Sequence, residues 1–124
     1  MTEAYWHRIR QWCATPVSGD SALRRLAEVF TEMGELMATE PELSTAASAA
    51  VLSRDPDVAQ LRTRIGAAIN DRLRAAVGPQ CPGPVLEALD IAVSGAMVQA
   101  GMGYSTYSEM AVRLTRIARL LIDE

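Results

Sequence analysis

The sequence has very few of the side chains that carry out catalysis or bind metal ions. Its 124 residues include one histidine and two cysteines. Cys13 and Cys81 have no cysteine or histidine neighbour at the spacing of a zinc site, so no metal is expected. His7 has no orienting partner or nucleophile, and a surface or partly buried histidine is expected rather than a general base. We therefore predict no catalytic residue, no metal, no cofactor and no enzymatic activity.

The chain also lacks a long uninterrupted apolar run and a cluster of basic residues. The longest mostly apolar stretch, residues 85–102, is interrupted by four polar or charged side chains, which excludes a membrane span. Residues 1–8 show no signal peptide, so a cytoplasmic location with both cysteines reduced is expected. The net charge is −3, and the 12 basic residues, all arginines, are scattered from Arg8 to Arg119. This chain alone is therefore not expected to bind nucleic acid.

The alternation of β-branched residues that is typical of strands is absent as well. The apolar residues instead recur at the three- and four-residue spacing of helices. With 49% apolar residues the chain can form one domain with a sizeable core. Proline and glycine divide it into six helical segments, which predicts an all-α fold, a single helical bundle of about six helices. The expected segments are residues 2–13, 20–39, 41–53, 55–77, 84–100 and 106–124.

Three of these segments begin with a capping signal. Asp20 is the expected N-cap of the second segment, and Asp55 caps the fourth, with Pro56 at the first helical position. Thr106 and Glu109 have the spacing of a capping box. The second segment has one apolar stripe, and its opposite side carries Arg24, Glu28, Glu32 and Glu35.

The fifth segment is apolar on almost every side. One face carries Leu89 and Val93, while another carries Gly95 and Met102. A chain of this size cannot readily cover both faces, so the last two helices are predicted to pair with their copies across a two-fold axis in a four-helix contact. The alternative is a monomer whose earlier helices wrap the fifth completely. The predicted dimer interface consists of Gly95, Val98, Met102, Met110, Leu114, Ile117 and Leu121.

The chain resembles a known protein family in the order of its segments and in two stretches, 55–62 (DPDVAQLR) and 107–114 (YSEMAVRL). The chain resembles the C-terminal regulatory domain of bacterial TetR-family transcriptional repressors over nearly its whole length. Residues 1–124 would form one ligand-binding and dimerisation domain, with residues 1–13 as the end of the helix that links the family's two domains. Proteins of this family begin with a DNA-binding head containing a helix-turn-helix, and no segment here matches it. The resemblance therefore implies that operator DNA is bound by a head outside this chain.

The resemblance also implies that a small, mostly apolar effector enters the bundle among its middle helices. Methionines can reshape around different ligands, and Asp90 or Asn70 could orient a polar group. For each residue the alternative is ordinary core packing, and the alternative function is a stand-alone helical module that binds another protein without a ligand. The expected ligand-binding residues are Phe30, Met33, Met37, Ile69, Leu73, Leu89, Asp90, Val93 and Met97.

Overall fold

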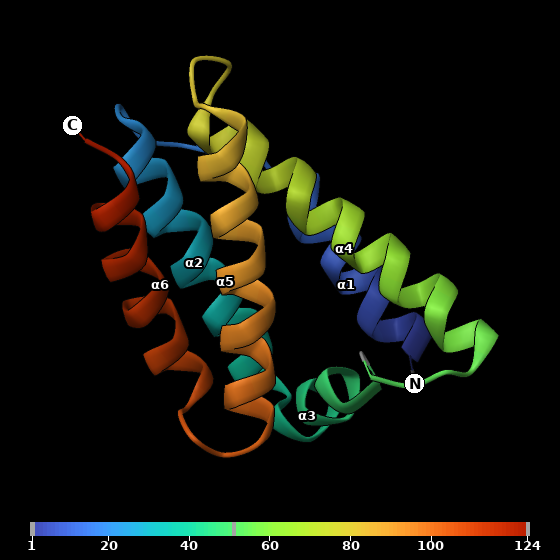
Figure 1. The fold of residues 1–124 in the computed structure, drawn as a ribbon. Helices are drawn as coiled ribbons and strands as arrows, with labels where there is room; N and C mark the ends of the chain where they lie inside the picture. The colour runs from blue at the N-terminus through green and yellow to red at the C-terminus, as the bar shows by residue number, and fades with distance from the viewer. Residues whose placement is uncertain (1, 51, 124) are drawn as a thin grey trace.

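The computed structural model confirms the predicted all-α class (Figure 1). It describes the backbone of residues 2–50 and 52–123, with the side chains in these ranges except those of residues 2–5, 43, 46–48 and 50. No helix in this described part combines the length and the apolar content needed to cross a membrane. The helices described are α1 (Thr2–Cys13), α2 (Ala22–Thr39), α3 (Pro41–Ala50), α4 (Pro56–Val77), α5 (Gly83–Gly101) and α6 (Tyr107–Leu121).

The capping signals of α4 and α6 are confirmed. Asp55 Oδ1 accepts a hydrogen bond from the backbone N–H of Asp57 at 2.9 Å, and Pro56 is the first residue of α4. In α6 the N–H of Glu109 donates to Thr106 Oγ1 at 3.0 Å, and the N–H of Thr106 donates to Glu109 Oε1 at 3.2 Å. Each carboxylate and hydroxyl thus satisfies an N–H group that the helix itself leaves unpaired.

The predicted cap of α2 was wrong by one residue. Ser21, not Asp20, is the N-cap, because its Oγ accepts a hydrogen bond from the N–H of Arg24 at 3.1 Å. Asp20 lies one position further out and forms an exposed ion pair with the Arg24 side chain, with 3.4 Å between the charged atoms. Two adjacent residues with good capping side chains compete for one helix start, and the sequence alone does not decide between them.

The core lies where α2, α4, α5 and α6 meet. Helix α6 packs against both α2 and α5, α4 packs against the same two helices, and α1 lies along α4 (Figure 1). Helices α2 and α6 approach closely at Gly34, where an added Cβ would lie 2.8 Å from the carbonyl oxygen of Tyr107. The largest fully buried apolar side chains are Phe30, Leu26, Leu73, Leu89, Met110, Leu114, Val29 and Val93.

Candidate functional site

A small apolar pocket lies between α1, α2, α4 and α5. Its volume is about 10 Å³, which is roughly the space for one water-sized sphere. Every lining side chain is apolar or aromatic, and three of the seven are methionines, which can change rotamer to fill or open the space. The lining consists of Ile9, Trp12, Met33, Leu36, Met37, Ile69 and Met97.

Four of the nine expected ligand-binding residues line this pocket together. They are Met33 and Met37 of α2, Ile69 of α4 and Met97 of α5. The half-buried Asp90 does not line it. The other four expected residues belong to the buried core beside the pocket and do not line it: Phe30, Leu73, Leu89 and Val93. The second candidate for a polar handle, Asn70, accepts a hydrogen bond from the exposed Arg74 side chain instead.

Helix α1 supplies one wall of the pocket. The ligand-binding residues expected from the sequence did not include any residue of this helix. Ile9 and Trp12 are three positions apart and therefore share a face of α1. Leu36 of α2 is the third lining residue that was missed. Periodicity groups Ile9 with Trp12, but it does not tell which other helices their common face meets.

A partly buried polar cluster joins α1, α2 and α4 at Trp12, Glu32 and Arg72. The indole Nε1 of Trp12 donates to Glu32 Oε2 at 2.6 Å, and Arg72 Nη2 donates to the same oxygen at 3.3 Å. The guanidinium carbon of Arg72 lies 4.8 Å from the centre of the Trp12 ring, within cation–π range. The Arg72 side chain is 3% exposed and that of Glu32 29%. The position of Glu32 opposite the apolar stripe of α2 indicated a solvent-facing residue. In the structure its side chain is instead partly buried and paired with Trp12 and Arg72.

Arg72 also holds the chain that leaves α1. Its Nη1 donates to the backbone oxygens of Cys13 and Thr15, and its Nη2 donates to Thr15 Oγ1 at 2.9 Å. These bonds fix the end of α1 against α4. The Nε of Arg72 is buried and has no hydrogen-bond partner in the structure.

An exposed apolar stripe runs along α5. Ile91 is 64% exposed, Met102 is 59% exposed, and Gly95 and the half-buried Val98 lie between them at spacings of four, three and four residues. An added Cβ at Gly95 would meet no atom within 4 Å. On the neighbouring α6, Leu120 is 86% exposed. For brevity we refer to these residues of the two neighbouring helices together as the α5–α6 face: Ile91, Gly95, Val98, Met102 and Leu120.

The predicted dimer interface is incorrect at Met110 and Leu114. Both side chains are fully buried in the core of the chain itself, because α6 turns its apolar stripe towards α2 and α5. They are therefore not available to a second molecule. The remaining interface candidates on α6, Ile117 and Leu121, are half-buried and keep part of their surface in solvent.

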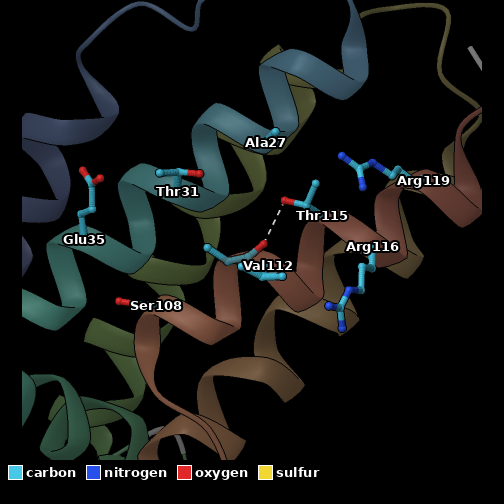
Figure 2. A pocket seen from close by; sticks show the side chains of 9 residues that line it. Ala27, Thr31, Glu35, Ser108, Val112, Thr115, Arg116 and Arg119 are labelled. Carbon is cyan, nitrogen blue, oxygen red and sulfur yellow. Dashed lines mark hydrogen bonds between the residues drawn. The ribbon is translucent and has the colours of Figure 1, made fainter.

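A larger groove of about 520 Å³ lies on the surface between α2 and α6 (Figure 2). Its floor includes Ala27 and Ala111, and its rim carries the carboxylate of Glu35 and the guanidinium groups of Arg116 and Arg119. None of the expected ligand-binding or interface residues lines it. Because it is open and carries charges of both signs, it lacks the enclosure and the apolar lining that are typical of sites for small apolar ligands.

Burial raises the pKa of both cysteine thiols above their ordinary value. At Cys13 the positive charge of Arg72 lowers the pKa in part and the negative charge of Asp71 raises it further. At Cys81 burial alone raises the pKa. Both cysteines are free, and the described residues hold no group of three or more histidine, cysteine, aspartate or glutamate side chains placed to bind a metal.

No protein-family model and no solved structure matches this chain. Over 131 aligned positions it is 39% identical to uncharacterized HTH-type transcriptional regulators of Mycobacterium bovis and of two strains of Mycobacterium tuberculosis. The match covers 98% of this chain and 58% of each relative. The chain is thus similar, over nearly its whole length, to a little more than half of proteins that are named as transcriptional regulators.

Proposed function

We propose that this chain is the effector-binding and dimerisation region of a TetR-like transcriptional repressor that acts in the cytoplasm. A head outside these 124 residues binds the operator, and a small, mostly apolar effector bound among the helices controls that binding. The observation that carries the proposal is the similarity of 98% of the chain to 58% of proteins named HTH-type transcriptional regulators. The role is one of binding rather than catalysis.

The pocket between α1, α2, α4 and α5 supports the effector part of the proposal. At about 10 Å³ it has to expand to take a ligand, since small-molecule sites usually measure roughly 300–1,000 Å³. Its three methionines allow that expansion at little cost in packing. Because Ile9 and Trp12 form one wall, a ligand that enlarges the pocket displaces α1 from α2 and α4. A shift of α1 is then the signal that passes to the DNA-binding head.

The α5–α6 face supports a homodimer. Burying one large apolar side chain completely is worth about 1.5–3 kcal/mol. The exposed parts of Ile91, Met102 and Leu120 together equal about two such side chains, so covering them in a dimer contributes roughly 3–6 kcal/mol for each protomer. Association itself costs roughly 4–15 kcal/mol. These three side chains therefore only balance the cost, and the dimer depends on close packing of the two α5 helices, which Gly95 permits at the centre of the stripe.

Gly95→Leu tests this interface with a matched control in the same chain. Gly66 also lies on an exposed helical position, and an added Cβ there likewise meets no atom within 4 Å. Both variants should keep the fold of the protomer. We expect sedimentation to show that Gly66→Leu is as dimeric as the wild type, while Gly95→Leu weakens association at least about tenfold through overpacking. Equal association of the two variants would place the interface elsewhere.

Ile117→Glu is a second probe, because Ile117 is a half-buried residue of the predicted interface on α6 and the variant puts an unpaired charge there. We expect it to dissociate the dimer as well. If the wild-type chain is itself a monomer at every concentration, the homodimer proposal fails, and the α5–α6 face becomes a candidate surface for a different protein.

A further inference from the structure

The polar cluster of Trp12, Glu32 and Arg72 borders the apolar pocket. Trp12 belongs to both, since its ring lines the pocket and its Nε1 binds Glu32. Glu32 lies four positions before Leu36 on α2, and Arg72 lies three positions after Ile69 on α4. Residues at these spacings share a helix face, and Leu36 and Ile69 both line the pocket. The lining of the pocket is thus entirely apolar or aromatic, and the buried Arg72 cation lies directly beside it, stacked on the ring of the lining residue Trp12.

The hydrogen bonds of that cation are incomplete. Arginine has five N–H groups, and four hydrogen bonds from Arg72 are made, all from Nη1 and Nη2. The fifth group, Nε–H, is buried without an acceptor. A buried donor without a partner costs about 1–3 kcal/mol. Glu32 neutralises the guanidinium with a single oxygen, Oε2, which it shares with the indole of Trp12.

We infer that the pocket selects small apolar carboxylic acids in their ionised form. The inference rests on the proposed function, because it names the class of effector for that pocket. The apolar part of the acid lies among the methionines, and its carboxylate accepts hydrogen bonds from Nε and Nη2 of Arg72, which form one edge of the guanidinium. Glu32 leaves Arg72 and turns towards solvent, to which its side chain is already 29% exposed.

The same arrangement disfavours other apolar ligands. An alcohol of equal length can accept one hydrogen bond from Nε but cannot neutralise Arg72, so it leaves the Glu32 ion pair in place and gains less than the carboxylate. A cationic amine finds the Glu32 carboxylate already paired with Arg72 and brings a like charge close to the buried guanidinium. Displacing Glu32 also removes the acceptor of the Trp12 indole, so binding of the acid frees α1 from its hydrogen bond to α2.

The test compares octanoate, 1-octanol and octylammonium at concentrations below micelle formation. They are titrated into the full 124-residue chain carrying Trp6→Phe, so that the fluorescence comes from Trp12. We expect octanoate to bind at least about tenfold more tightly than 1-octanol and octylammonium to bind most weakly. We expect Glu32→Gln to strengthen octanoate binding several-fold and to leave 1-octanol unchanged, because it removes the competing carboxylate but keeps an acceptor for Trp12.

Glu28→Gln is the matched control, since Glu28 lies one turn earlier on α2 and is exposed. It removes the same charge from the same helix and should change the affinity for neither octanoate nor 1-octanol. Equal affinities for octanoate and 1-octanol, or an equal response of both glutamine variants, would overturn the selectivity for acids and leave the effector pocket in place. Binding of none of the three probes would remove this pocket as the effector site, and the inference with it.

Discussion

Gly34→Ala tests the close contact between α2 and the start of α6, which fixes the position of α6 in the fold. An alanine Cβ at this position would lie 2.8 Å from the backbone oxygen of Tyr107 and 3.4 Å from Cβ of Ala111. The first distance is too short for a carbon and an oxygen in contact. Tyr107 begins α6, so its carbonyl cannot turn away without moving the start of that helix. Either α2 and α6 separate or the overlap remains.

The expected change in the free energy of unfolding is the balance of two opposing effects. Alanine stabilises a helix interior by about 1 kcal/mol relative to glycine. Overpacking against neighbours that cannot move costs about 1–3 kcal/mol, and contact with backbone rather than with a flexible side chain favours the upper half of that range. We therefore expect a net loss of about 1–2 kcal/mol. For a chain of this length that corresponds to a Tm lower by roughly 3–10 °C.

The assay is thermal unfolding followed by far-UV circular dichroism at one fixed protein concentration, because dimerisation makes Tm depend on concentration. Gly66→Ala is the control, since Gly66 is exposed in the interior of α4 and an added Cβ there has open space. It should raise Tm by a few degrees through helix propensity alone. If Gly34→Ala raises Tm as much as Gly66→Ala does, α2 and α6 are not packed as closely as the structure has them.

Three further changes have defined outcomes. Thr106→Ala removes one half of the capping box and should lower the free energy of unfolding in urea by about 1 kcal/mol; an unchanged value would mean that water replaces the cap. Met33→Trp fills the pocket and should weaken binding of octanoate at least about tenfold with the sedimentation coefficient unchanged; unaltered binding would remove Met33 from the site. The pKa of the thiols of Cys13 and Cys81 is raised, so both stay neutral to higher pH than a free cysteine. Their alkylation by iodoacetamide should therefore be slower than that of a cysteine peptide at neutral pH and accelerate at higher pH, and equal rates would contradict the burial of the thiols.

Features whose partners lie within one helical turn could be predicted from the sequence. The cap at Asp55 and the capping box of Thr106 and Glu109 depend on residues two or three positions away, and both are present in the structure. Met110 and Leu114 show the limit of the same approach. Their spacing correctly indicates an apolar stripe, but a stripe does not tell whether it meets α2 of the same chain or a second molecule.

The pocket could be predicted only in part for the same reason. Met33 and Met37 share a face of α2, and their flexibility indicated a site that can reshape. The cluster of Trp12, Glu32 and Arg72 joins residues that are far apart in the sequence. On its own helix Glu32 lies on the polar side and Arg72 is one of many arginines, so only the three-dimensional arrangement brings these charges together beside the pocket.

The most direct test of the central claim is a native mass spectrum of the purified chain, because it reports the number of subunits and any retained small molecule together. We expect a mass of twice the 13.4 kDa of one chain, with a bound acid as an additional mass where one is retained. A bare monomer over the whole accessible concentration range would contradict the account of this chain as an effector-binding dimerisation region.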